Sequence, residues 1–219
     1  MSRACGESKA CPEGSSQAFE FLISGIKGFL AADEGRALYA LGVTQSRLGP
    51  CLEIGSYCGL STVYLGLGIR ENDGVLFSID HHQGSEEHQP GEEYHDPDLL
   101  DPVSGRFDSF PEFRKTLRRA GLEDTVVPIV AASELAARQW ATPLSLVFID
   151  GGHSTAAALS DYRAWAPLLL PGGVLAIHDL FPDPSQGGQA PYTIYTMALA
   201  SGLFEELERV NTLGMLRRL

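Results

Sequence analysis

The chain has 219 residues, 44% of them hydrophobic, which is enough for one well-packed domain and short for two. Its formal net charge of -12 and sequence pI near 4.8 argue against a protein that tracks nucleic-acid phosphates with Lys and Arg, and they disfavour an anionic membrane surface. The sequence shows no secretory signal and no run of about 20 apolar residues, so we expect a cytoplasmic protein without nucleic-acid or membrane partners.

The N-terminal part of the chain predicts a polar tail followed by two helices. Residues 1–17 are expected to form a flexible N-terminus, in which Cys5 and Cys11 fit structural thiols better than a zinc site or a disulfide. Apolar residues at helical spacing then predict helices over 18–31 and 34–47. These helices would cover one face of a sheet.

Short apolar runs alternate with longer amphipathic segments through the middle of the chain. The runs predict buried parallel strands at 51–54, 75–79, 126–130, 144–149 and 174–177. The segments between them predict the crossover helices that parallel strands require, at 61–69, 110–120, 133–139 and 155–169. This alternation is typical of a doubly wound α/β fold.

The C-terminal tail departs from this alternation. It predicts a helix over 192–201 and then a hairpin whose strands cover 204–210 and 215–219. We therefore predict a Rossmann-like, doubly wound, mostly parallel seven-stranded sheet with a C-terminal antiparallel hairpin at its edge. A single domain over 18–219 would contain all of it.

Two polar loops are expected beside the carboxyl ends of the strands, where open α/β sheets bind ligands. The insertion 81–106 is rich in acids and histidines, and its length favours a lid over a plain surface excursion. A metal site made of His88 and His95 within it is disfavoured, because no further ligand spacing supports one. The loop 181–191 is expected to form the other wall of the site.

The first strand runs into a turn with the sequence EIGSYCGLS over 53–61. Gly55 and Gly59 permit a tight turn, and the free N–H groups at the start of the next helix can hold an anionic group. Tyr57 stands where the dinucleotide fingerprint has its second glycine, which argues against a pyrophosphate. Asp80 ends the second strand, the usual position of an acid that accepts hydrogen bonds from ribose hydroxyls.

This turn resembles the cofactor turn of catechol-type, metal-dependent O-methyltransferases. The sequences FIDGGH at 148–153 and PGGVLAIHD at 171–179 are similar to the bacterial branch with macrocin-type and cephalosporin-type enzymes. The resemblance implies S-adenosylmethionine (SAM) as cofactor, with Ser61 at the methionine carboxylate, Asp80 at the ribose and Ser133 near the adenine. The expected cofactor-binding set is Glu53, Gly55, Tyr57, Gly59, Ser61, Asp80 and Ser133.

Polar residues also follow two neighbouring buried strands. Asp150, His178 and Asp179 could converge on a hard divalent cation, for which Mg²⁺ is the first candidate. His178 could instead orient a ligand or form ordinary hydrogen bonds at a strand end, and an imidazole ligand would favour Mn²⁺, Fe²⁺ or Zn²⁺. His153 is the expected general base, with Asp150 beside it in catalysis, and macrocin-type enzymes resemble this chain in having histidine there. The plainer alternative is that both acids only cap helices.

We therefore expect a SAM-dependent methyltransferase that performs metal-assisted O-methylation of a small hydroxylated metabolite. A nicotinamide-dependent oxidoreductase is the first alternative, disfavoured by Tyr57 and by acid and histidine pairs that hydride transfer does not require. A non-catalytic cofactor-binding module is the second, and it would leave Asp150 and His153 without a task. The acceptor stays undetermined, and a homo-oligomer stays open.

Overall fold

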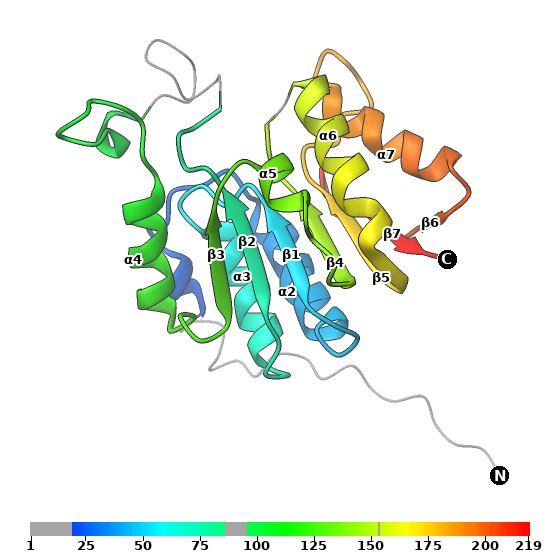
Figure 1. The fold of residues 1–219 in the computed structure, drawn as a ribbon, viewed down its shortest axis with the longest axis horizontal. Coiled ribbons are helices and arrows are strands. Elements are labelled where there is room, and N and C mark those ends of the chain that lie inside the picture. The colour runs from blue at the N-terminus through cyan, green and yellow to red at the C-terminus, as the bar shows by residue number, and fades with distance from the viewer. Residues whose placement is uncertain (1–18, 86–95, 153) are drawn as a thin grey trace.

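A seven-stranded sheet forms the central layer of the computed structural model, which describes residues 19–85, 96–152 and 154–219 (Figure 1). The strand order is β3-β2-β1-β4-β5-β7-β6, and the first five strands in this order are parallel to one another. This confirms the predicted fold class. The strands are β1 (Cys51–Ile54), β2 (Leu76–Asp80), β3 (Val126–Val130), β4 (Leu144–Ile149), β5 (Leu169–Ile177), β6 (Phe204–Glu206) and β7 (Gly214–Arg218).

Helices cover both faces of the sheet. One face carries α2 (Ala32–Gln45), α3 (Leu60–Arg70) and α4 (Phe110–Ala120). The other carries α5 (Ser133–Ala137), α6 (Thr155–Trp165) and α7 (Ala190–Ala200). Two short 3-10 helices, η2 (Pro97–Leu99) and η3 (Ala166–Leu168), lie between these elements. Figure 1 shows α2 and α3 on one side of the strands and α6 on the other.

The central strands are mainly apolar because helices pack against both faces of the sheet. Along β4, Leu146 and Phe148 belong to the core under α2 and α3, whereas Val147 and Ile149 belong to the core under α6 and α7. This two-sided burial explains why the sequence shows continuous apolar runs rather than alternation. A polar side chain at the carboxyl end of such a strand departs from this apolar pattern, which indicates a specific structural or functional role.

The predicted helix over 18–31 is wrong in length. Residues 19–23 are helical, and the chain then turns at Gly25, whose φ of +75° lies in the left-handed region that favours glycine. The guanidinium of Arg119 donates to the carbonyl oxygens of Leu22 and Ser24, which satisfies the end of this helix. Residues 26–31 are non-helical, and they bring the segment 27–30 to the carboxyl edge of the sheet.

The C-terminal hairpin lies at the sheet edge, as predicted, with its second strand on the inside. β7 pairs antiparallel with β5 on one side and with β6 on the other. The loop between β6 and β7, which includes Thr212, consequently returns to the carboxyl end of β5. Within the described ranges, no helix combines the length and the apolar character needed to cross a membrane.

Several predictions lie outside the described residues. They concern the flexible N-terminus at 1–17 with its two cysteines, residues 86–95 of the lid-like insertion, and His88, His95 and His153. Cys51 and Cys58 are described, and both are buried free thiols.

Candidate active site

The turn after β1 is shaped by its contact with the end of β4. Gly55 has a φ of +83°, and a Cβ on it would overlap the carbonyl oxygen of Asp150. Tyr57 also has a positive φ, 48°, so it adopts the left-handed conformation that glycine usually takes. Gly59 precedes the first turn of α3 as its N-cap. The close contact between this turn and the end of β4 is therefore made by backbone atoms rather than by side chains.

Asp80 at the end of β2 holds this turn. Its Oδ2 accepts hydrogen bonds from the backbone N–H groups of Ser56 and Tyr57, both at 2.9 Å, and its Oδ1 accepts one from the N–H of His82 at 2.7 Å. Asp80 also lines the cavity described below. The acid that the sequence predicts to bind the ribose thus also fixes the geometry of this loop.

Glu53 is fully buried beneath the turn and does not line the cavity. Its carboxylate accepts hydrogen bonds from the hydroxyls of Ser61 and Thr62 at 2.6 Å and of Ser78 at 2.9 Å. Burial raises the pKa of Glu53 to about 7 despite these donors. The sequence grouped Glu53 with the cofactor contacts, whereas the structure places it one layer below, as a support for Ser61.

Ser133 begins α5 on the opposite side of the cavity. Its Oγ accepts the indole N–H of the fully buried Trp165 at 2.7 Å, and its hydroxyl hydrogen-bonds to Asp161. Burial raises the pKa of Asp161 to about 6. Asp161 lines the cavity with Ser133, and sequence reasoning missed it. Asp161 follows Ala158 by three residues, so both side chains lie on the same buried face of α6. An acid on the apolar face of a helix was the sequence signal that could have revealed it.

A cavity of about 590 Å³ opens at the carboxyl ends of the parallel strands. Its walls come from the turn after β1, the ends of β2, β4 and β5, and the start of α5 and α6. The segment 27–30 supplies a further wall, whereas no described residue of 181–191 lines the cavity. The prediction that this loop forms the second wall is therefore wrong for this cavity, and the non-helical segment 27–30 forms a wall instead.

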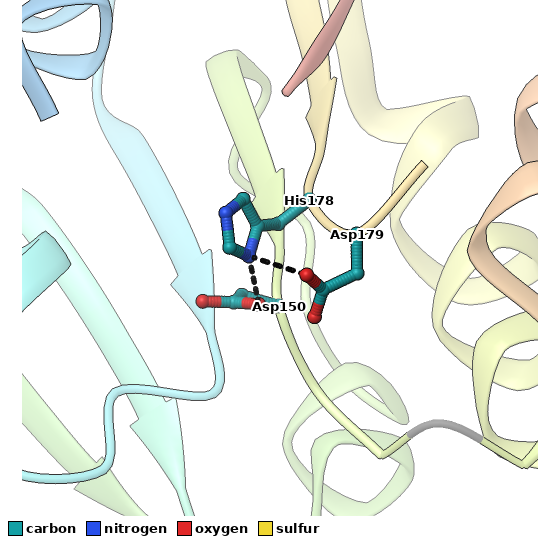
Figure 2. Close-up of side chains that lie close together, drawn as sticks. All are labelled: Asp150, His178 and Asp179. Carbon is teal, nitrogen blue, oxygen red and sulfur yellow. Dashed lines mark hydrogen bonds and ion pairs between the residues drawn. The ribbon is translucent and has the colours of Figure 1, made fainter. Parts of the chain in front are cut away.

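Asp150, His178 and Asp179 meet at this cavity (Figure 2). The ring Nδ1 of His178 lies 3.1 Å from Oδ1 of Asp150 and 3.4 Å from Oδ1 of Asp179. One ligand atom from each of the three residues falls within 4.8 Å of the other two. Asp179 takes a positive φ of 58° to place its carboxylate there. The structure thus brings together the three residues that the sequence assigned to a metal.

Glu34 completes this cluster from a distant element, and sequence reasoning missed it. Its Oε2 lies 3.1 Å from Nε2 of His178, and both side chains are buried, with 3% and 4% of their surface exposed. The three carboxylates around the ring hold the pKa of His178 well above its usual range. Glu34 and Leu38 are four residues apart and share the buried face of α2. A charged residue on this apolar face was the sequence signal that could have revealed Glu34.

The sheet order, the turn after β1, the acid ending β2 and a cavity above both define a class I, SAM-dependent methyltransferase. Residues 52–180 match the family model described as a methyltransferase domain, and the chain belongs to that family. Similar solved structures share the fold across nearly the whole chain at low sequence identity.

Three of these structures illustrate the likeness. An O-methyltransferase from Bacillus cereus, in complex with S-adenosylhomocysteine (SAH), is 16% identical with a TM-score of 0.60, covering 96% of this chain and 93% of that one. The O-methyltransferase TomG from Streptomyces achromogenes, in complex with SAM, is 19% identical with a TM-score of 0.57, covering 95% and 91%. An SAH-bound methyltransferase from Podospora anserina is 14% identical with a TM-score of 0.54, covering 98% and 100%.

Proposed function

We propose that this methyltransferase transfers the methyl group of SAM to a hydroxyl oxygen of a small molecule, with a divalent cation bound at Asp150, His178 and Asp179. The observation that carries the proposal is the convergence of these three side chains on the same cavity as the turn after β1. The O-methyltransferases among the similar structures agree with oxygen as the acceptor atom.

The cofactor is assigned to the side of the cavity between the turn and α5. The backbone N–H groups at the start of α3, next to Ser61, suit the methionine carboxylate. Asp80 suits the ribose hydroxyls, and Ser133 with Asp161 suits the adenine end, because both line the cavity at α5 and α6. The sulfonium methyl would then face the cluster at the ends of β4 and β5.

The donor set fits a divalent cation by its chemistry. Two carboxylates and one imidazole nitrogen lie close enough to share an ion, and carboxylate oxygens suit Mg²⁺ while the imidazole admits Mn²⁺ or Fe²⁺. A bound cation supplies Lewis acidity that lowers the pKa of an acceptor hydroxyl. Asp150 and Asp179 reach this point from adjacent strands, whose register pairs Ile149 with Ile177. The rigid sheet therefore fixes their separation.

His153 is proposed as the base that removes the hydroxyl proton, on the ground of its place three residues after Asp150. His178 is unsuited to that role. Its ring nitrogens face carboxylates on both sides, and only 4% of its surface is exposed. A base must reach the acceptor with an accessible lone pair. A Phe or Gln at position 153 is expected to lower the rate of methyl transfer without weakening SAM binding.

The acceptor is proposed to lie against the segment 27–30 and the aromatic side chains beside it. The rings of Tyr57 and Phe107 stack at 6.2 Å between centroids on this side of the cavity. Lys27 fixes the segment by binding Asp96 at 2.6 Å and Asp98 at 3.1 Å. An apolar wall with one polar anchor suits a small, partly aromatic hydroxylated molecule.

Titration calorimetry with SAM, SAH and NAD, each with and without Mg²⁺, tests the cofactor assignment. SAM and SAH should bind wild type and the control variant Asp124→Ala, which alters an exposed acid, and should bind Asp80→Asn more weakly. Labelled methyl transfer to small phenols, diols and amines then tests the acceptor atom. Binding of NAD in place of SAM would overturn the cofactor assignment, and transfer only to amines would overturn oxygen as the acceptor.

A further inference from the structure

Glu34 contacts three parts of the chain that are far apart in sequence. Its Oε2 accepts the backbone N–H of Ala31 at 3.1 Å and faces Nε2 of His178, and its Oε1 accepts the N–H and the hydroxyl of Thr212 at 2.8 and 2.7 Å. Both oxygens are therefore held in place by other groups. A carboxylate with this many fixed donors is a rigid acceptor for the imidazole.

The position of Glu34 excludes a direct role toward substrate. Its side chain is 3% exposed and does not line the cavity, whereas His178 does. Glu34 can therefore influence the site through the histidine ring. Figure 2 shows that ring with one nitrogen facing both aspartates and the other pointing away from them. The nitrogen that points away is the one that meets Glu34.

We propose that Glu34 is a positioning residue that anchors the Nε2–H of His178 and thereby aims Nδ1 at Asp150 and Asp179. This inference rests on the proposed cation site, because an imidazole that serves as a ligand usually donates its other N–H to a carboxylate. Without this anchor, the ring could rotate about its side-chain torsions and turn Nδ1 away from the two aspartates. That rotation would remove one donor atom from the cluster.

Cation affinity gives the first test. Free Mn²⁺ is counted by electron paramagnetic resonance in the presence of the full-length protein without SAM or acceptor. Glu34→Gln keeps the shape of the side chain and is expected to weaken Mn²⁺ binding about 10- to 100-fold. Asp33→Asn is the matched control, because Asp33 is the preceding acid on the same helix and contacts Asn211 of the same loop. It should bind Mn²⁺ as wild type does.

Imidazole spectroscopy gives a second test that needs no metal, and its first reading needs only the wild-type protein. In ¹⁵N-histidine-labelled wild-type protein, the resonance assigned to His178 should show a proton on Nε2 that exchanges slowly with water. A ring that carries its proton only on Nδ1 overturns the proposal. Glu34→Ala should lose the slow exchange, and Asp33→Asn should keep it.

The two tests separate this inference from the proposed function. Loss of Mn²⁺ binding in Asp150→Asn, together with wild-type binding in Glu34→Gln, would overturn the role of Glu34 and leave the cation site standing. If Asp150→Asn bound Mn²⁺ as tightly as wild type does, the proposed cation site would be overturned instead. The spectrum of His178 would then still decide whether Glu34 anchors the ring.

Discussion

The carbonyl oxygen of Asp150 occupies the space that a side chain on Gly55 would need. The turn after β1 and the end of β4 are therefore locked together by backbone contact. We predict that Gly55→Ala lowers the free energy of unfolding by at least about 2 kcal/mol, because the added methyl group meets both this clash and an unfavourable φ of +83°. Urea unfolding measures the loss, and SAH titration should show weakened binding.

Gly172→Ala is the matched control for this prediction. Gly172 has nearly the same φ, +82°, but nothing lies within 4 Å of the position its Cβ would take. It should lose about 1 kcal/mol from backbone strain alone and should bind SAH as wild type does. Equal losses in the two variants would show that the contact with Asp150 contributes nothing.

Glu53 should make stability depend on pH. Burial raises its pKa from 4.5 to about 7, so the folded protein keeps this proton while the unfolded chain releases it. The resulting stabilisation is fully present below the unfolded pKa of 4.5 and is lost as pH rises from there to about 7. The unfolding free energy should fall by up to about 3 kcal/mol over this range. Glu53→Gln has no proton to lose. Relative to wild type, it should therefore gain unfolding free energy between about pH 4.5 and about pH 7.

Chemical unfolding at a series of pH values measures this difference. Glu123→Gln changes an exposed acid that pairs with Arg118 on the surface, and it should leave the pH profile unchanged. A constant difference between wild type and Glu53→Gln across the range would refute the prediction.

Ser133 should contribute to stability as well as to the cavity wall. Ser133→Ala leaves the indole N–H of the fully buried Trp165 without its acceptor. An unsatisfied buried donor costs about 1–3 kcal/mol, which thermal unfolding can resolve. Ser160→Ala serves as control, because its hydroxyl bonds the exposed side chain of Glu134 and its loss should cost under about 0.5 kcal/mol.

Asp179→Asn should abolish cation-dependent methyl transfer while leaving the backbone intact. Asparagine tolerates the positive φ of 58° at this position, so loss of the carboxylate charge is the main change. EDTA should stop methyl transfer by wild type, and Mg²⁺ should restore it in wild type but not in the variant. Asp183→Asn, whose carboxylate contacts Ser185, should behave as wild type. Full wild-type activity in EDTA would contradict the cation role.

The elements that the sequence predicted well are those whose burial depends on local pattern. Strands at 51–54, 126–130 and 144–149 match their predicted bounds, because each is a short, mainly apolar run in the sequence. β1 and β4 are buried along their whole length, whereas β3 lies at the sheet edge and is partly exposed. The helix expected at 18–31 is shorter in the structure because the chain turns at Gly25, and a distant side chain stabilises that turn. Arg119, almost one hundred residues away, satisfies the carbonyls at its early end.

The candidate site divides in the same way. Asp150 and Asp179 were predictable because each follows a buried strand, and adjacent parallel strands bring their carboxyl ends together. Glu34 and Asp161 were not predicted, because an acid on a helix is usually solvated and only the packing of that helix decides otherwise. Sequence spacing indicates where the chain turns, and it carries little information on which distant helix faces a strand end.

The bonds of Glu34 also determine when the site can assemble. This carboxylate joins residues 31, 178 and 212, so the surroundings of His178 draw on segments from both ends of the domain. During synthesis, a nascent chain that has exposed β1 to β5 still lacks the loop between β6 and β7. Contacts this far apart along the chain form late, because loop closure costs entropy before they gain any energy. The segment around Thr212 must therefore have left the ribosome before this enzyme can complete its centre.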